Sequence, residues 1–477
     1  MKKFLAMLLA AAMVLSMTAC GAGGSTATET KAQETVVGNT EAPTLETKAA
    51  EELKAEAEVA KDYSGRKLSL MMSIGGGGNW WQPVADRMKE LYPGLEVEVV
   101  FDSTAADMFR TQYLAGEAPD AFMINTGSIP NYESIEQGIV QPVDYVLQLP
   151  TLDGTSTLGD ILDMDVFTNG AYDGHYYVMH EFQYLNGFWY DAAFFREKNL
   201  TVPTDWNSFL KLCDECKALG IKVMGYTGVE APEYAVNYWF TPMLASVDYD
   251  AYVKYSNLDS SVFDSAAMKN VMEKMKYLRD NDLMSQYTIG SGTSEAQVSF
   301  INHDFAIYPC GSWLEAEMAD AWTEGWELTF LPFTFGDVDD KDHKFMGVGG
   351  QSSRITSTTK ENLDLVGEFY RVLYCDEEAI RGEVATHGNV MLIPGFAEKY
   401  GDLVDPSVRT ASACADDMRK ITNQAGGWYP DMRTEVGNAI NAYYNGDIDE
   451  AAFIQRLRDK MDSIKNDSTV TKYNFEG

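Results

Sequence analysis

The residues that most often carry catalysis are present in this chain, but their spacing matches no catalytic motif. None of the histidines forms the H-E-x-x-H pattern of zinc hydrolases, and no G-x-S-x-G sequence marks a nucleophilic serine. The acidic segment 337–342 has Lys341 at a ligand position of a calcium loop, so it predicts a solvated loop instead. We therefore expect no catalytic residues, no cofactor and no metal ligands. The histidines are His175, His180, His303, His343 and His387.

A glycine run at 75–78 follows an apolar segment, where a phosphate-binding loop would lie. It lacks the Gly-Lys-Ser/Thr ending of such a loop and continues into Asn79, Trp80 and Trp81. Two bulky indoles would block a polyphosphate, whereas they suit a flat, neutral ring. The net charge of −35 at pH 7 also argues against nucleic acid and against an anionic ligand. A neutral sugar agrees with both observations.

Aromatic side chains stand beside polar ones at several expected loop positions. Sugars bind in clefts through rings that stack on their C–H faces and through planar polar groups that bridge hydroxyls. Two of the polar residues end the third predicted strand, where open α/β sheets form their ligand crevices. Trp189 and Trp206 fall in periodic segments and are expected in the core. The candidates from this pattern are Trp80, Trp81, Asn125, Thr126, Tyr184, Asn186, Glu230, Glu233 and Tyr234.

The elements that must position these residues alternate between strand and helix. This repeated βαβ pattern predicts an α/β fold with mostly parallel sheets flanked by helices. The first strands are expected near 68–74, 95–101 and 121–125, with helices near 84–91 and 105–114 between them. Further helices are expected near 205–219, 265–279, 312–322, 362–373, 431–444 and 449–464.

The first 20 residues have the pattern of a secretion signal, with Lys2 and Lys3, an apolar run over 4–14 and small residues before Cys20. The last part resembles a bacterial lipobox, in which the cysteine becomes lipidated; ordinary secretion is the alternative. Residues 21–63 contain almost no large apolar side chain and predict a disordered tether. We therefore expect the protein at the cell surface, anchored to the outer face of the cytoplasmic membrane through Cys20.

Five further cysteines show no disulfide-framework spacing. Cys213 and Cys216 form a C-x-x-C sequence, which admits a redox or metal site. Both also share helical spacing with Trp206, Phe209 and Leu210, so the pattern favours packing on the buried face of one helix.

Five tracts, in order along the chain, resemble the motifs of family 1 extracellular solute-binding proteins. Each is weak alone, but together they cover nearly all of the folded chain. Two departures from the family pattern stand out, because Asp191 replaces the usual Asn and His303-Asp304 replaces the usual Gly-Lys. The tracts are Leu91–Glu98, Ala115–Asp120, Gly187–Phe195, Pro203–Phe209 and His303–Trp313.

This resemblance implies a two-lobed periplasmic-binding-protein fold, with a ligand between the lobes and no catalysis. It implies an N-lobe of 64–180 plus 345–400 and a C-lobe of 181–344 plus 401–477. It also implies the permease subunits of an ABC importer as partners of a monomeric protein. By similarity to maltose-binding relatives, Tyr234, Trp313 and Trp428 match positions that stack on sugar rings. Arg354 is interpreted as bracing the hinge, with a carboxylate-binding role as the alternative.

Several tryptophans near one site favour an oligosaccharide over a monosaccharide. The tract 220–234 resembles the branch of the family that binds N-acetylglucosamine or chitobiose, so an amino sugar is an alternative ligand. Two other classes stay open, a surface-anchored glycoside hydrolase and a signalling or adhesion lipoprotein. A hydrolase would need two facing carboxylates, for which the 72 acidic residues offer no local signature.

Overall fold

The structure is a computed structural model that describes residues 44–74, 78–125, 128–167, 171–285, 289–290, 292–422, 429–470, 472 and 475. The predicted signal peptide, Cys20 and most of the predicted tether lie outside the described residues, as do Thr126 and Trp428. Within the described residues, no helix has both the length and the apolar character needed to cross a bilayer.

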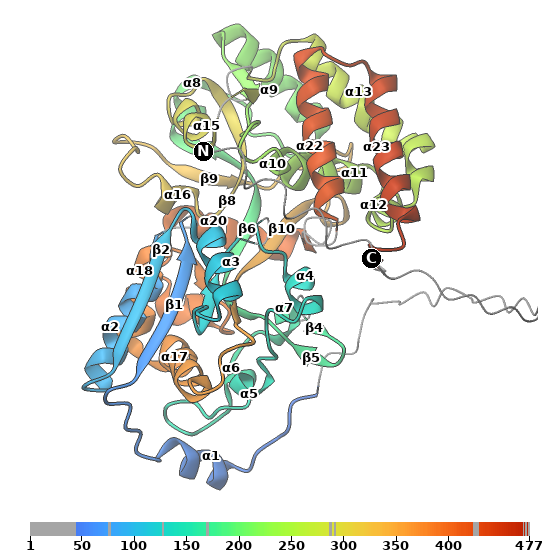
Figure 1. Ribbon diagram of the computed structural model, residues 1–477. Helices are drawn as coiled ribbons and strands as arrows, with labels where there is room; N and C mark the ends of the chain where they lie inside the picture. The colour runs from blue at the N-terminus through green and yellow to red at the C-terminus, as the bar shows by residue number, and fades with distance from the viewer. Residues whose placement is uncertain are drawn as a thin grey trace, which may run out of the picture. The chain divides into compact units, whose positions relative to one another are not determined.

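A mixed sheet organises the described chain, which confirms the α/β class (Figure 1). Its strands follow the order β2-β1-β3-β10-β6-β8-β7, and β9 and β11 pair with β6 while β12 pairs with β10. Parallel pairing joins β1 to β2 and β3, β7 to β8, and β10 to β12. The bounds are β1 Lys67–Ser73, β2 Glu96–Asp102, β3 Ala121–Met123, β6 Met179–Asp191, β7 Lys222–Met224, β8 Phe305–Gly311, β9 Leu328–Leu331, β10 Phe345–Ile355, β11 Val390–Met391 and β12 Arg419–Thr422, with a separate hairpin of β4 Ala171–Tyr172 and β5 His175–Tyr176.

The long strands β6 and β10 join two groups of elements. The first group contains β1, β2 and β3, and the second contains β7, β8 and β9. They run antiparallel from the pair Gly347–Asn186 to the pair Ser353–Met179, with an irregularity between Gln351 and Ser352. Beyond this stretch, β10 pairs with β3, whereas β6 continues along β8 and β9. Strands β6 and β10 therefore contribute side chains to both groups of elements.

Helices cover the strands of the first group. In α2 the inward face is Trp81, Val84, Ala85 and Met88, and all four residues are buried. Helix α18 packs on α2 closely, since a Cβ at Gly382 would lie 2.6 Å from Pro83. The helices here are α2 Trp81–Leu91, α3 Ala105–Ala115, α4 Asn131–Glu136, α5 Asp144–Leu147, α6 Leu158–Ile161, α7 Met164–Phe167, α17 Leu363–Cys375, α18 Glu377–His387 and α19 Phe396–Tyr400.

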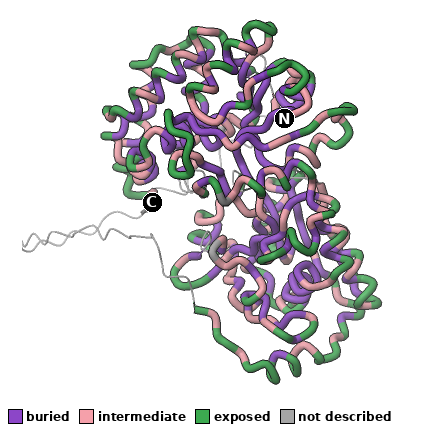
Figure 2. Tube along the Cα trace, turned by 180° about the vertical axis from the view of Figure 1, so that it is seen from behind, coloured by how far each residue is buried: buried purple, intermediate pink, exposed green. Residues whose placement is uncertain are grey.

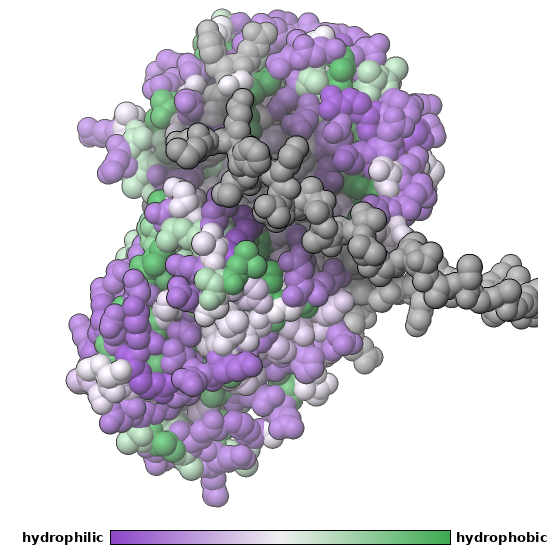
Figure 3. Space-filling model, viewed as in Figure 1, coloured by the Kyte–Doolittle hydropathy of each residue, from purple (hydrophilic) through white to green (hydrophobic). Residues whose placement is uncertain are grey.

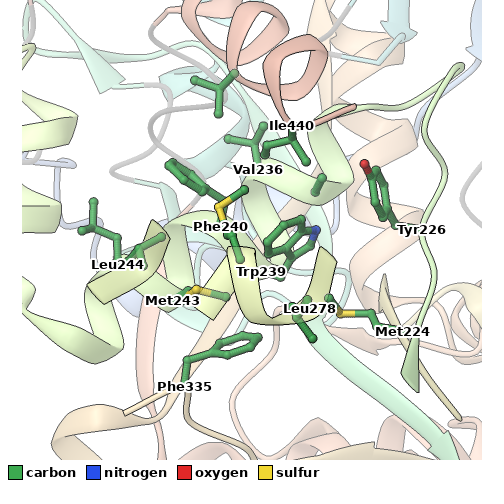
Figure 4. Close-up of a cluster of buried hydrophobic side chains, with 14 of the residues drawn as sticks. Met224, Tyr226, Val236, Trp239, Phe240, Met243, Leu244, Leu278, Phe335 and Ile440 are labelled. Carbon is green, nitrogen blue, oxygen red and sulfur yellow. The ribbon is translucent and has the colours of Figure 1, made fainter. Parts of the chain in front are cut away.

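A larger set of helices packs around the second group. The π-helix η1 brings Trp239 and Phe240 into a core with Met243, Leu278, Phe335 and Ile440 (Figure 4). These elements are α8 Ala192–Lys198, α9 Trp206–Leu219, α10 Glu233–Ala235, η1 Val236–Phe240, α11 Thr241–Val247, α12 Tyr249–Ser256, η2 Ser260–Asp264, α13 Ala266–Asp280, α15 Thr293–Ile301, α16 Leu314–Glu317, η3 Lys341–His343, α20 Pro406–Cys414, η4 Ala415–Asp417, α22 Pro430–Asn445 and α23 Glu450–Asn466.

Helix α9 shows how local sequence sets this packing. Asp205 and Ser208 form a capping box at its start, and Gly220 ends it in a left-handed conformation. The helix buries Phe209, Cys213 and Cys216 against the second core. Burial raises the pKa of each thiol far above its ordinary value. The two cysteines therefore pack as apolar core residues, as the helical spacing predicts.

The hydrophobic cores draw on two separate sets of chain segments. Two clusters draw their buried residues from 63–182 and 355–408, and two others from 185–348 and 411–464. Figure 2 shows the central strands buried and the outward helix faces exposed. Hydrophilic residues cover most of the face in Figure 3, as the composition leads us to expect. The lobe boundaries themselves stay a prediction.

Residues 44–63, which we call the strap, differ from the predicted disordered tether. They contain helix α1 (Ala50–Ala57), which buries Leu53, and Tyr63 is also buried. A Cβ at Gly154 would lie 2.9 Å from the Cα of Lys54, so the strap packs closely on the first group of elements. Lys61 pairs with the buried carboxylate of Glu368. The prediction of disorder does not hold for these residues, because Leu45, Leu53 and Tyr63 pack on the first group of elements and Lys61 pairs with Glu368.

Candidate functional site

Four aromatic side chains meet at the junction of the two groups of elements. Trp313 makes edge contacts with Tyr184 at 5.2 Å, with Tyr234 at 6.2 Å and with Tyr238 at 6.3 Å between ring centroids. Tyr234 and Tyr238 lie 4.9 Å apart. We call these four residues the aromatic cluster. Three of them, Tyr184, Tyr234 and Trp313, are predicted ligand-binding residues, and the structure brings them together from three separate segments.

The strands position these rings by leaving out neighbouring side chains. A Cβ at Gly349 would lie 2.2 Å from the Tyr184 ring, and a Cβ at Gly311 would lie 2.0 Å from the Trp313 ring. Such separations are far inside van der Waals contact, so only glycine fits at both positions. The rings therefore occupy space over the backbone of β10 and β8. Tyr184, Tyr234 and Trp313 stay partly exposed, and Tyr238 is buried.

Two tyrosines of the cluster, Tyr184 and Tyr234, have raised pKa values. Burial raises the pKa of Tyr184 above its ordinary value, and burial together with Tyr238 raises that of Tyr234 strongly. Each ring thus offers an apolar face with an uncharged hydroxyl at its tip. An assembly of this kind suits a neutral ligand with both C–H faces and hydroxyl groups.

Tyr238 was not among the sequence candidates because it lies in a continuous apolar run. It follows Tyr234 by four residues, which places both rings on one face of a helical segment. The π-helical turn that contains Tyr238 is a form often found at functional sites. The spacing was therefore visible in the sequence, whereas the π-turn was not.

Arg354 fixes the loop that carries Asn125. The guanidinium is wholly buried and donates to the backbone carbonyls of Ile129, at 2.6 Å, and of Ile124. Its plane lies over the Phe122 ring, with 4.6 Å from the guanidinium carbon to the ring centroid. These contacts agree with the bracing role, and the Nε atom of Arg354 has no hydrogen-bond partner in the described structure. Asn125 itself is exposed at the end of β3.

Trp80 and Trp81 lie elsewhere than the sequence pattern indicates. Both indoles are wholly buried, and their N–H groups donate to one oxygen of Glu181, at 2.7 and 2.9 Å. The Ser353 hydroxyl donates to the other oxygen at 2.5 Å. Burial raises the pKa of Glu181 to about 7 despite these three donors. In this structure neither indole exposes a face to a ligand, because Glu181 holds both in the core.

The remaining candidates have varied positions. Glu230 is exposed and accepts a hydrogen bond from the backbone N–H of Thr293 at 2.8 Å, so it tethers a loop. Glu233 begins α10, directly before Tyr234. Trp189 is buried with its indole N–H on the carbonyl of Cys310, and Trp206 packs against the second core, as predicted.

The described part of the chain was also compared with two other kinds of site, a metal centre and a surface groove. There, no group of three or more His, Cys, Asp or Glu side chains could hold a metal ion. A groove of about 340 Å³ lies between α3 and α4, lined in part by Phe109, Tyr113 and Pro130. It shares no residue with the aromatic cluster. The aromatic cluster is the candidate site because its geometry, and not cavity size, matches a ligand chemistry.

Comparison with known proteins agrees with this architecture. The diacetylchitobiose-binding protein NgcE of Streptomyces coelicolor is 22% identical over 394 residues, which are 80% of either chain. The structure of RafE in complex with raffinose has a TM-score of 0.65 at 18% identity, covering 83% of this chain and 99% of its own. A chitin-oligosaccharide-binding protein has a TM-score of 0.65 at 16% identity, covering 83% and 98%.

A match to a protein-family model identifies the family. Residues 73–352, more than half of the chain, match the family described as bacterial extracellular solute-binding proteins. The matched region contains β2 to β9 and most of β10, and with them the whole aromatic cluster. The chain therefore belongs to the bacterial extracellular solute-binding protein family.

Proposed function

We propose that this protein is the substrate-binding component of a carbohydrate ABC importer, which captures an oligosaccharide and delivers it to permease subunits. The observation that carries the proposal is the aromatic cluster. In it, Tyr184 packs with a hydrophobic core of the first group of elements, and Trp313 and Tyr234 pack with a hydrophobic core of the second group. A sugar held by these rings would contact both groups of elements at once. That arrangement suits capture between two lobes, followed by release when they separate.

The proposed site extends beyond the cluster. Asn125 is placed to offer polar contacts from the loop that Arg354 braces. Thr126, Glu233 and Trp428 belong to the same proposal on the strength of the sequence pattern. Trp80 and Trp81 support the site indirectly, through the buried carboxylate of Glu181 on β6. No chemical step is required of any of these residues.

The ligand class rests on the relatives. The names of the related proteins mention diacetylchitobiose, raffinose and chitin oligosaccharides. A neutral oligosaccharide is common to them and suits a chain with a net charge of −35. An N-acetylglucosamine oligomer such as diacetylchitobiose is the second candidate, because the relative named for it aligns over 394 residues.

Location and assembly complete the proposal. The lipobox-like sequence before Cys20 supports a lipid anchor on the outer face of the cytoplasmic membrane, with the protein acting as a monomer. Palmitate or a similar acyl chain on Cys20 would be detected by mass spectrometry of membrane-extracted protein. Loss of membrane association in Cys20→Ala, with secretion retained, is the expected result, and unchanged association would contradict the anchor.

Binding is tested with residues 21–477 against disaccharides to tetrasaccharides of glucose, xylose, galactose and N-acetylglucosamine. A ligand at 100 times its dissociation constant adds about 2.7 kcal/mol of stability, so a melting shift reports binding. The sugar is then recovered and analysed. Intact sugar supports a binding protein, whereas new reducing ends would indicate the hydrolase alternative. The absence of any shift across the panel would overturn the carbohydrate assignment.

A further inference from the structure

Asn186 lies on β6 between two glycines. It pairs in register with Gly347 of β10 on one side and with Gly311 of β8 on the other. Residues directly opposite each other in an antiparallel pair present their side chains on one face. The Asn186 side chain therefore has no lateral neighbour on either adjoining strand at its own level. The space beside this amide is therefore left for side chains from outside the two adjoining strands.

Both rings of the principal aromatic contact border that space. Tyr184 precedes Asn186 by two residues on the same strand, so both side chains project from the same face. The Trp313 ring fills the position of a Cβ on Gly311, directly beside Asn186. The two rings meet at 5.2 Å. The Asn186 amide thus belongs to the floor of the aromatic cluster.

The amide is buried and unpartnered. Asn186 is 1% exposed, and neither Oδ1 nor Nδ2 has a hydrogen-bond partner in the described structure. A primary amide brings two donors and an acceptor oxygen with two lone pairs, and buried amides are almost always paired. Leaving the whole group unpaired lowers the stability of the fold. Such a cost persists in a native protein when the group serves something other than folding.

Asn389 shows what a structural amide looks like in the same molecule. It is also wholly buried, but its Oδ1 accepts from the Ser312 hydroxyl at 2.5 Å. Its Nδ2 donates to the backbone carbonyl of His387 at 2.6 Å. Asn389 therefore holds its surroundings together, whereas Asn186 makes no such bond. The contrast separates a fold-stabilising amide from one that is available to a ligand.

We propose that Asn186 is a ligand-binding residue that reads two adjacent hydroxyls of a sugar ring held against Trp313. Its Oδ1 accepts from one hydroxyl, and its Nδ2 donates to the next. This inference rests on the proposed function. A planar amide matches the spacing of vicinal hydroxyls and leaves the apolar C–H face of the sugar to the rings. Because the rings cover the amide, a ligand reaches it only when Tyr184 and Trp313 move apart.

The test compares Asn186→Leu and Asn186→Ala with the control Asn389→Leu, all in residues 21–477. Calorimetric titrations use diacetylchitobiose, cellobiose, raffinose and maltotriose as probes, and the melting temperature is measured without sugar. Asn186→Leu should melt at or above the wild-type temperature, because it removes an unpaired polar group. It should also bind the sugar that wild type binds at least about tenfold more weakly, which is 1.4 kcal/mol. Asn389→Leu should melt lower.

Matched deoxy sugars sharpen the result. Removal of a hydroxyl that Asn186 reads should weaken binding to wild type but add no further loss in Asn186→Ala. Wild-type affinity in both Asn186 variants, or a melting loss in Asn186→Ala equal to that of Asn389→Leu without a change in affinity, would overturn the inference alone. Failure of the wild-type protein to bind any probe would overturn the proposed function, and this inference with it.

Discussion

The imidazole Nε2 of His303 lies 2.9 Å from Oδ2 of Asp191. These are the two positions where the sequence departs from the family pattern, and the structure shows that they are partners. The His303 ring also stacks between Phe194, at 3.9 Å, and Trp326, at 4.7 Å. Asp191 caps helix α8 by accepting from the backbone N–H of Ala193. The side chain of Asp191 therefore contacts this helix cap, His303 and the backbone N–H of Glu327.

Replacement of Asp191 should destabilise the protein at neutral pH. Burial alone would raise the pKa of its carboxyl, but hydrogen bonds from His303 and from the backbone of Glu327, Phe194 and Ala193 lower it below the ordinary 3.8. A lowered pKa contributes stability that is present above about pH 4 and is lost as the pH falls further. Asp191→Ala should cost about 1–2 kcal/mol at pH 7. Urea unfolding at pH 7 and pH 3 measures this, and an equal deficit at both values would contradict the assignment.

Truncation of the aromatic cluster should remove binding without unfolding the protein. Trp313→Ala and Tyr184→Ala should each weaken sugar binding by about 1–3 kcal/mol, because each loses a stacking face. Trp428→Ala should do the same if its predicted role holds. Trp322→Ala is the matched control, since that partly buried indole contacts Trp326 outside the cluster. Calorimetric titration decides, and equal affinities in the Trp313 variant and wild type would refute the site.

Glu181 should make stability fall as the pH rises. Its pKa in the folded protein is raised to about 7, mainly by burial, from an ordinary value of 4.5. The native state then binds more protons than the unfolded chain between these values, so stability decreases across that interval. From this shift we expect wild type to lose about 2–4 kcal/mol between pH 5 and pH 8 through this group.

Glu181→Gln isolates that contribution. The amide oxygen can still accept from the two indole N–H groups, and no charge has to be buried. The variant should be more stable than wild type at pH 8, with a difference that shrinks towards pH 5. Urea unfolding of both proteins at pH 5 and pH 8 gives the change in unfolding free energy with pH for each. Parallel pH dependence of the two proteins would mean that Glu181 does not titrate as described.

The strap should be needed for full stability. Leu53 is 4% exposed and Leu114 is 88% exposed, so the two leucines form a matched pair on different helices. Leu53→Asp should release α1 and cost about 1–3 kcal/mol, whereas Leu114→Asp should cost little. Limited proteolysis should cleave the first variant early within 44–63. Identical cleavage of both variants would show that the strap is not held by Leu53.

Local periodicity predicted the elements of the first group well. The strand at 95–101 and the helix at 105–114 correspond to β2 and α3, because alternation and helical spacing are local signals. The capped helix α9 and its buried cysteines were equally visible. The antiparallel pairing of β6 with β10 was not predicted, since it joins segments far apart in the sequence.

The site was only partly predictable for the same reason. The pattern of aromatic and polar residues indicated Tyr184, and the family resemblance indicated Tyr234 and Trp313, but the contact between them depends on the sheet register. The burial of Trp80 depends on Glu181, a residue distant in sequence with no pattern that announces its role. The position of Asn186 opposite two glycines depends on the pairing of three strands that are far apart in the sequence. Contacts between distant segments therefore account for what the sequence analysis missed.

The most direct measurement is calorimetric titration of residues 21–477, wild type and Trp313→Ala, with the oligosaccharide panel. The account predicts that wild type binds one linkage class, consumes no sugar, and loses about 1–3 kcal/mol of binding energy in the variant. A wild-type protein that binds none of these sugars, or a variant that binds as tightly as wild type, would contradict it.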